Sequence, residues 1–214
     1  MKIAAIIPVK TFLNAKTRLN LPTQKVEELC KLMLEEILGV ISTSSKIEKI
    51  ILITKEKKAI EIGKKFNTVT IIDEKEESVN EAVSLADEYL LENNFNASVV
   101  FPQDIPFIKI EDIDFMLKHQ LHPNFAIIVP SRKFDGTNAL VRMPTDLMKT
   151  HYDDDSYRNH MKTAKEHTMN VAMVFVKRIM YDIDDQEDLK FLLEQNEKPD
   201  LGEKIKKILN SRLF

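Results

Sequence analysis

The chain has 214 residues, 43% of them hydrophobic, and its 31 Lys and Arg side chains nearly balance 34 Asp and Glu, giving a net charge of -3. This composition supports a sizeable core and excludes wholesale disorder, and it lacks the basic excess of proteins that coat nucleic acid. The single cysteine, Cys30, excludes an internal disulfide and a cysteine-based zinc cluster. A reducing compartment therefore fits best, and we expect a cytoplasmic protein.

No apolar run approaches the roughly 20 residues that a membrane helix needs. The apolar segment 3–9 is short, contains Pro8 and precedes Lys10. We interpret it as a buried strand and not as a signal peptide, because no small-residue cleavage site follows it. The sequence therefore predicts no membrane partner.

Short apolar runs alternate with longer amphipathic segments. In chain order, the first part predicts strand 3–9, helix 23–42, strand 50–54, helix 55–65, strand 68–72, helix 78–93, strand 97–101, helix 110–120 and strand 125–129. The rest predicts strand 139–143, helix 156–167, strands 171–176 and 180–183, and helices 186–194 and 203–210. This alternation is typical of an α/β domain with a parallel sheet, and the less regular second half adds an antiparallel element. Without a glycine-rich linker or a repeat, residues 1–214 are predicted to form one domain.

Ligands of open α/β sheets bind beyond the carboxyl ends of the strands. After the first strand, Lys10, Lys16 and Arg18 place three cations in one loop. A nucleoside triphosphate needs such cations, and arginine binds phosphate oxygens in a bidentate way. The alternative is a solvated basic loop, and the spacing alone does not separate the two.

Acidic residues follow two other predicted strands. Asp104 lies in a stiff turn between Pro102 and Pro106, where a carboxylate can bind Mg²⁺ together with substrate phosphates; a simple turn-forming aspartate is the alternative. Asp182 and Asp184 share one face of an extended chain and repel each other unless a cation lies between them. These two are therefore further candidates for a metal site.

The neighbouring acids have a simpler interpretation. Asp185 and Asp188 match a capping box at the start of the helix predicted over 186–194. We expect both to be structural.

Two more segments offer polar groups. Gly136 permits close approach to a ligand, and Thr137 and Asn138 beside it supply hydrogen bonds, although an ordinary hairpin turn explains the same residues. Ser156 begins a predicted helix, whose free amides can bind an anion; a plain capping serine is the alternative.

Together these segments resemble the 2-phospho-L-lactate guanylyltransferases of deazaflavin-coenzyme biosynthesis. The similarity extends from Ile6 to Leu189. It rests on the order and spacing of five motifs, which are IPVK followed by AKTRL, PQDIP, SRKFDGTNAL, SYRNH and DIDDQEDL.

The resemblance implies a three-layer α/β/α domain with a mainly parallel mixed sheet, the small nucleotide-diphosphosugar-transferase (GT-A-like) fold. It implies that GTP and 2-phospho-L-lactate react to give lactyl-2-diphospho-5'-guanosine and pyrophosphate, and that the enzyme is a homodimer. Residue roles carry over by position: triphosphate binding by Lys10, Lys16 and Arg18, a nucleotide contact by Asn80, Mg²⁺ binding by Asp104, Asp182 and Asp184, and acceptor binding by Thr137 and Ser156.

This chain departs from the family pattern at two places. Asp153–Asp155 stand where relatives usually have Gly-Pro-Gly, and Asn159 stands where relatives often have a basic residue. Three acids beside an anionic acceptor are repulsive unless they point away or meet a cation. Two alternative interpretations stay open. The acceptor can be phosphoenolpyruvate or another phosphorylated compound, or the protein can bind a nucleotide without catalysing a reaction.

Overall fold

The structure of the protein is a computed structural model that describes residues 1–118 and 124–209. Seven strands form one sheet in the order β3-β2-β1-β4-β6-β5-β7. The strands are β1 (Ile3–Pro8), β2 (Lys49–Ile53), β3 (Val69–Ile71), β4 (Ala97–Val100), β5 (Phe125–Pro130), β6 (Thr137–Met143) and β7 (Asn170–Met173). Only β6 runs against its two neighbours, β4 and β5, while the other pairings in the described chain are parallel. The prediction of a mainly parallel mixed sheet is confirmed.

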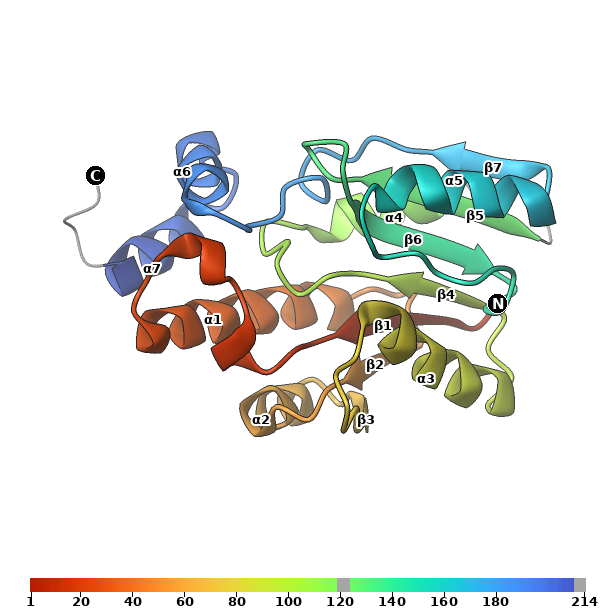
Figure 1. The fold of residues 1–214 in the computed structure, drawn as a ribbon, viewed down its shortest axis with the longest axis horizontal. Coiled ribbons are helices and arrows are strands. Elements are labelled where there is room, and N and C mark those ends of the chain that lie inside the picture. Colours follow the sequence, from red (N-terminus) through yellow and green to blue (C-terminus); the bar gives the residue numbers. More distant parts are fainter. Residues whose placement is uncertain (119–123, 210–214) are drawn as a thin grey trace.

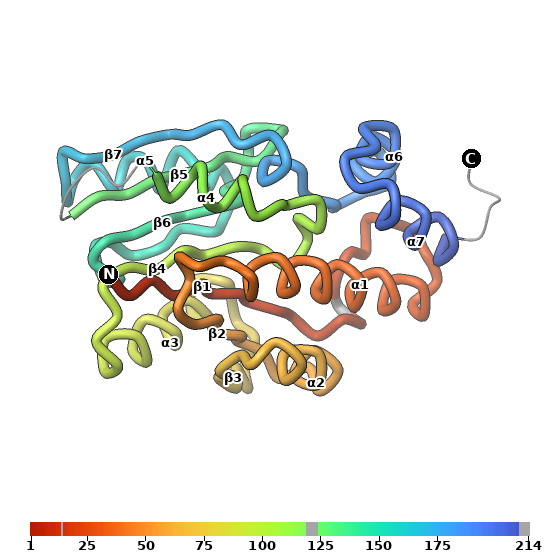
Figure 2. The backbone as a smooth tube through the Cα atoms, turned by 180° about the vertical axis from the view of Figure 1, so that it is seen from behind, coloured from red at the N-terminus to blue at the C-terminus, as the bar shows by residue number. Residues whose placement is uncertain are grey.

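Helices cover both faces of this sheet. They are α1 (Thr23–Ser42), α2 (Lys57–Lys65), α3 (Val79–Glu92), α4 (Ile110–Lys118), α5 (Ser156–His167), α6 (Gln186–Gln195) and α7 (Pro199–Leu209). Helices α3 and α5 lie on the face seen in Figure 1, and α1 and α4 lie on the opposite face, seen in Figure 2. The protein therefore has the three-layer α/β/α architecture that the resemblance implies.

The alternation of side chains along β1 divides the core between the two faces. Ile3, Ala5 and Ile7 pack in the cluster that contains the buried residues of α1, α4, α6 and α7. Ala4 and Ile6 pack in the second cluster, beneath α3 and α5. All five side chains are at most 3% exposed, so β1 is apolar on both faces, as expected for a central strand.

Local sequence signals account for several helix boundaries. Helices α1 and α5 have the predicted bounds. The Ser78 hydroxyl accepts a hydrogen bond from the backbone N–H of Glu81 (3.1 Å) and caps α3, so this helix begins one residue later than predicted. Asp185 and Asp188 form the predicted capping box of α6. The predicted ends of α4 (residues 119–120) and α7 (residue 210) lie outside the described residues.

The prediction of a strand over 180–183 is wrong. This segment crosses the ends of the strands, and single hydrogen bonds hold it in place of a ladder: Arg132 N–H donates to the Met180 carbonyl (2.8 Å), and Ile183 N–H donates to the Asp104 carbonyl (3.0 Å). Its backbone groups are thus satisfied by two different loops, which brings the acidic segment after β7 to the turn after β4.

The strand order also determines where a ligand can bind. The chain leaves β1 toward β2 and β3 on one side and returns to β4 on the other, so a crevice opens between β1 and β4. Because β6 is antiparallel, its first residue, Thr137, lies at the same edge of the sheet as the carboxyl end of β4. None of the described helices is long and apolar enough to cross a membrane.

Candidate functional site

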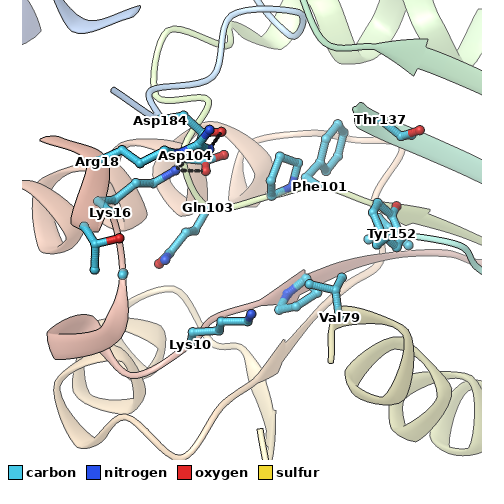
Figure 3. Close-up of a pocket in the computed structure, with 15 residues that line it drawn as sticks. Lys10, Lys16, Arg18, Val79, Phe101, Gln103, Asp104, Thr137, Tyr152 and Asp184 are labelled. Atoms are coloured by element: carbon cyan, nitrogen blue, oxygen red, sulfur yellow. Dashed lines mark hydrogen bonds and ion pairs between the residues drawn. The ribbon is translucent and has the colours of Figure 1, made fainter. Parts of the chain in front are cut away.

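A pocket of about 370 Å³ lies at the carboxyl ends of β1 and β4. Apolar groups from both strand ends and from α3 form part of its wall, and charged and polar groups complete it. The lining residues are Pro8, Lys10, Ala15, Lys16, Thr17, Arg18, Val79, Val100, Phe101, Pro102, Gln103, Asp104, Thr137, Tyr152 and Asp184. In Figure 3, Lys10 and Val79 lie on one side of the pocket and the cluster around Lys16 and Asp184 on the other.

The loop after β1 brings the predicted cations to this pocket. Two short 3₁₀ turns, η1 (Phe12–Asn14) and η2 (Thr17–Leu19), flank Lys16, which has a left-handed backbone (φ 54°). For a lysine this conformation costs on the order of 1 kcal/mol, and such strain concentrates at functional sites. It directs Lys16 toward the turn after β4, where its side chain is only 8% exposed.

Lys16 and Arg18 meet two of the three predicted metal-binding carboxylates. The Lys16 ammonium donates to Asp104 and, at 2.7 Å, to Asp184 Oδ1. Arg18 Nη2 donates to Asp184 Oδ2 at 2.6 Å, although its side chain is 68% exposed. The predicted basic and acidic motifs, 168 residues apart between Lys16 and Asp184, therefore form one ionic cluster.

Asp182 lies close to this cluster without lining the pocket. Its carboxylate accepts a hydrogen bond from the Asn138 side chain, and Asn138 also donates to the Ile179 carbonyl at 3.0 Å. Asn138 is buried and does not line the pocket either. In this structure it holds the acidic segment in place beside β6.

The electrostatics of the cluster follow from its burial and its excess of negative charge. Burial raises the pKa of Asp182 to about 7, and the charges of Asp104 and Asp184 act in the same direction. Burial also tends to raise the pKa of Asp184, but Lys16 and Arg18 together hold that pKa below its ordinary value. Burial is the largest influence on the pKa of Lys16 and lowers it, yet the two carboxylates hold the pKa above its ordinary value. The cluster therefore attracts further positive charge.

Among residues 1–118 and 124–209, no group of three His, Cys, Asp or Glu side chains is arranged to hold a metal ion. The Lys16 ammonium already contacts Asp104 and Asp184. However, Asp104 Oδ1 is buried without a hydrogen-bond partner. An unpaired anionic oxygen in a pocket is suited to a cation or a donor on a ligand, so Asp104 fits a divalent metal ion.

Two other residues that line the pocket each have a buried polar atom without a partner. The atoms are Gln103 Oε1 and the Tyr152 hydroxyl, on which the charges of Arg142 and Asp87 also act. Neither residue was among the predicted site residues. Burial, as the largest influence, raises the pKa of Tyr152, so its hydroxyl stays protonated and can donate. Unpaired buried polar atoms are costly, and their gathering at one pocket is expected where a ligand completes their hydrogen bonds.

Thr137 and Ser156, the predicted acceptor-binding residues, lie in contact. The Ser156 hydroxyl donates to Thr137 Oγ1 at 3.2 Å, and His160 Nδ1 lies 2.9 Å from the same oxygen. Thr137 lines the pocket, while Ser156 and His160 are buried behind it. The i, i+4 spacing of Ser156 and His160 places them on one face of α5, and this spacing is the sequence signal that would have included His160.

Asn80 and the acidic run Asp153–Asp155 do not line the pocket. Asn80 accepts a hydrogen bond from Tyr152 N–H (2.8 Å) and donates to Asp153 (3.3 Å), so it links α3 to this loop. Asp155 pairs with Arg158 at 2.7 Å and has a left-handed backbone (φ 55°), which favours the glycine that relatives usually have nearby. Asp153 thus meets an amide and Asp155 a cation.

Comparisons with known proteins show similarity over most of the chain. The family described as "Guanylyl transferase CofC like" matches residues 3–209. A phosphoenolpyruvate guanylyltransferase of Conexibacter woesei is 27% identical over 91% of this chain and 88% of its own length. A 2-phospho-L-lactate guanylyltransferase of Methanothermobacter thermautotrophicus is 26% identical over 97% and 92%, and one of Methanosphaera stadtmanae is 31% identical over 90% and 84%.

Solved structures show the same fold at low sequence identity. A protein of Desulfovibrio desulfuricans described as a nucleotide-diphospho-sugar transferase superposes with a TM-score of 0.72 at 17% identity, covering 92% of this chain and 89% of that chain. A nucleotidyl transferase of Methanothermobacter covers 91% and 97% with a TM-score of 0.64 at 11% identity. These likenesses establish the fold, and the family match over nearly the whole chain establishes more: this protein belongs to the CofC-like guanylyl transferases.

Proposed function

We propose that residues 1–214 form a nucleotidyltransferase domain that joins GTP and 2-phospho-L-lactate. The products are lactyl-2-diphospho-5'-guanosine and pyrophosphate, a step in the biosynthesis of a deazaflavin coenzyme. The observation that carries the proposal is the pocket itself: cations and carboxylates at one end, and hydroxyl groups at the other. This arrangement suits a triphosphate beside a small acid that bears a phosphate.

The reaction needs no nucleophile from the protein. An ionised phosphate oxygen of the acceptor attacks the α-phosphorus of GTP, and a new phosphorus–oxygen bond forms. The bond from the α-phosphorus to the oxygen that bridges to the β-phosphorus breaks, and pyrophosphate leaves with that electron pair. Both reactants are anions, so the protein lowers the barrier mainly by positioning them and neutralising charge.

Lys10, Lys16 and Arg18 supply the positive charge in this proposal. Lys10 and Arg18 are exposed and line the pocket, where they can contact phosphate oxygens; Arg18 also pairs with Asp184. Lys16 is held by Asp104 and Asp184, so it contributes by moving part of its hydrogen bonding from these carboxylates to the triphosphate. Arginine and lysine at such positions lower the barrier by stabilising the charge that develops on the leaving pyrophosphate.

Asp104, Asp182 and Asp184 would hold Mg²⁺. The unpaired Asp104 Oδ1 and the excess negative charge around Asp182 support this assignment. Bound there, Mg²⁺ would neutralise phosphate charge and orient the triphosphate for in-line attack. A metal ion held there would compete with the Lys16 ammonium for Asp104 and Asp184, and the phosphates would offer that ammonium other acceptors.

At the other end of the pocket, Thr137 and Ser156 would bind the carboxylate or phosphate of the acceptor. Tyr152, with its unpaired hydroxyl, lies on the same side of the pocket as Thr137 (Figure 3). Asn138 would act on the substrate through Asp182, and Asn80 through the loop that carries Tyr152. Phosphoenolpyruvate is the second candidate acceptor, because the Conexibacter relative acts on it at a similar level of identity.

The test is release of pyrophosphate by the purified protein with GTP and Mg²⁺. Reactions contain 2-phospho-L-lactate, phosphoenolpyruvate or no acceptor, and a chelator is the control for the metal. We expect release with 2-phospho-L-lactate only. Release with phosphoenolpyruvate in its place would keep the chemistry and change the acceptor. If a folded protein binds GTP but releases nothing with either acceptor, the proposal fails and a silent nucleotide-binding protein is favoured.

A further inference from the structure

His160 is a buried histidine that the proposed chemistry does not use. Its side chain is 0% exposed, yet both ring nitrogens have partners. The backbone N–H of His151 donates to His160 Nε2 at 2.8 Å, and Nδ1 lies 2.9 Å from the Thr137 hydroxyl oxygen. The ring thus connects the loop before α5 to the pocket wall.

These two contacts determine which ring nitrogen carries the proton. A backbone N–H can only donate, so Nε2 must be the unprotonated acceptor. A neutral imidazole carries one N–H, which is then on Nδ1 and is donated to Thr137 Oγ1. The opposite tautomer would place two N–H groups against each other inside the protein.

The tautomer in turn determines what the hydroxyl pair of Thr137 and Ser156 can do. The pair has two hydroxyl protons, and the bond between the two oxygens (3.2 Å) uses one of them. His160 gives a proton to the pair and takes none. One hydroxyl proton therefore remains, and among the described hydrogen bonds it has no protein acceptor. Thr137 lines the pocket, so this proton is available to an anionic oxygen of a ligand there.

We propose that His160 is a positioning residue for the acceptor: by donating from Nδ1 it keeps the Thr137–Ser156 pair in the state that donates a hydrogen bond to an anionic oxygen of the acceptor. This inference rests on the proposed function for the identity of the ligand. Thr137 lies at the opposite end of the pocket from Lys16 and Asp104 (Figure 3), so the effect should be confined to the acceptor and leave GTP binding unchanged.

Two substitutions separate the two contacts of the ring. In His160→Asn the side-chain amide nitrogen reaches the place of Nδ1 and can still donate to Thr137. In His160→Gln the amide lies farther out, at the place of Nε2, and the donor to Thr137 is lost. The matched control is His167→Gln, because His167 is an exposed histidine on the same helix whose side chain contacts the Thr163 carbonyl (2.9 Å) and not the hydroxyl pair.

We measure the KM of the acceptor at saturating GTP, and the KM of GTP at saturating acceptor. His160→Gln should raise the acceptor KM about tenfold or more, the size expected for a hydrogen bond to a charged group, with the GTP KM within about twofold of wild type. His160→Asn should keep the acceptor KM within about threefold of wild type. Equal damage by both variants, or a parallel rise in the GTP KM, would overturn the proposal and leave a merely structural histidine.

A second measurement uses the wild-type protein and does not depend on turnover. Nitrogen-15 NMR of labelled histidine should show Nδ1 of His160 protonated and Nε2 unprotonated, and titration with phosphoenolpyruvate or 2-phospho-L-lactate should perturb the Nδ1–H signal and saturate. A proton on Nε2, or no saturable binding of either acid, would overturn the inference. If both acids bind and His160→Gln weakens them while no pyrophosphate is released, the inference stands and the proposed function alone fails.

Discussion

The protein has two clusters of ion-paired side chains, one around Arg142 and one around Lys16, and they differ in how completely their charges are paired. Arg142 is fully buried and forms a fork with Asp87, with Nη2–Oδ1 at 2.6 Å and Nη1–Oδ2 at 2.8 Å. Its Nη atoms also donate to Ser98 and to the Met148 carbonyl. The Lys16 cluster, in contrast, sets Lys16 and the exposed Arg18 against the carboxyl groups of Asp104 and Asp184, with Asp182 close by, and it borders a pocket.

This difference indicates what each group contributes. The charges of Arg142 and Asp87 are matched one to one and do not line the pocket, although Arg142 Nε is also buried without a partner. They therefore serve the packing of α3 against β4 and β6. In the Lys16 cluster, negative charge is in excess and Asp104 Oδ1 has no hydrogen-bond partner. Lys16 itself has the strained left-handed backbone. Groups left incomplete beside a cavity are suited to a substrate that completes them.

The largest effect on stability is expected from breaking the ion pair between Arg142 and Asp87. Asp87→Leu leaves the buried Arg142 guanidinium without its carboxylate and should lower the free energy of unfolding by about 3–5 kcal/mol. Chemical denaturation measures this loss. The double variant Asp87→Leu/Arg142→Met removes both charges and should recover most of it. An equal loss in the double variant would show that packing at these positions, and not charge, controls stability.

A change in the Lys16 cluster should lower catalytic turnover and leave the stability of the fold almost unchanged. Asp104→Asn keeps the shape of the side chain but removes the charge proposed to bind Mg²⁺, and turnover should fall about 10²-fold or more. The midpoint of thermal unfolding should change little, and the exposed Asp200→Asn is the matched control for loss of one acidic charge. Turnover near that of wild type, with unchanged dependence on Mg²⁺, would remove Asp104 from the metal site.

A pH series tests the neutral state of His160, which lies between the two regions. Burial lowers the pKa of His160 to about 3, and the charges of His151 and Arg142 act in the same direction. The unfolded chain takes up a proton below about pH 6.5 and the folded chain does not, so stability is lost as the pH falls from about 6.5 toward 3. Between about pH 7 and pH 5 this histidine should contribute a loss of about 2 kcal/mol.

The comparison of wild type with His160→Asn isolates this contribution, because other groups titrate alike in both proteins. Denaturation at a series of pH values should show the difference in unfolding free energy between the two proteins narrowing as the pH falls. A difference that does not vary with pH would mean that His160 is protonated equally in the folded and unfolded chains.

Much of the fold could be predicted because it depends on local patterns. The apolar stripe of α1 and the capping box at Asp185 are written in neighbouring residues, and the structure has them where the sequence places them. The segment 180–183 has the apolar alternation of a strand but no free strand edge to join. Two of its backbone hydrogen bonds join it to Arg132 and Asp104, more than 40 residues away, which no local pattern encodes.

The residues of the site likewise fall into those that the sequence predicts and those that only the structure identifies. Lys10, Lys16, Arg18 and Asp104 could be predicted to gather at the pocket because each follows a strand end. Asp184 also lines the pocket, although the strand predicted just before it does not form. Tyr152 and Gln103 have no distinguishing sequence pattern, and only the three-dimensional structure shows that their polar atoms are buried without partners. Metal binding by Asp104, Asp182 and Asp184 and the binding roles of the other candidate residues stay predictions.

The smallest effect on stability is expected from replacing either of two arginines of similar exposure, only one of which lines the pocket. Arg18 (68% exposed) and Arg158 (64% exposed) each pair with an aspartate, at 2.6 and 2.7 Å, but only Arg18 lines the pocket. Either change to Gln should alter the free energy of unfolding by less than about 1 kcal/mol, because exposed ion pairs contribute little. Arg18→Gln alone should raise the KM of GTP, by about tenfold at low salt, since it removes a charge-assisted contact to phosphate. If Arg18→Gln loses stability while the KM of GTP is unchanged, Arg18 is a structural partner of Asp184. If the two variants raise the KM of GTP equally, net charge acts at a distance and Arg18 makes no direct contact with GTP.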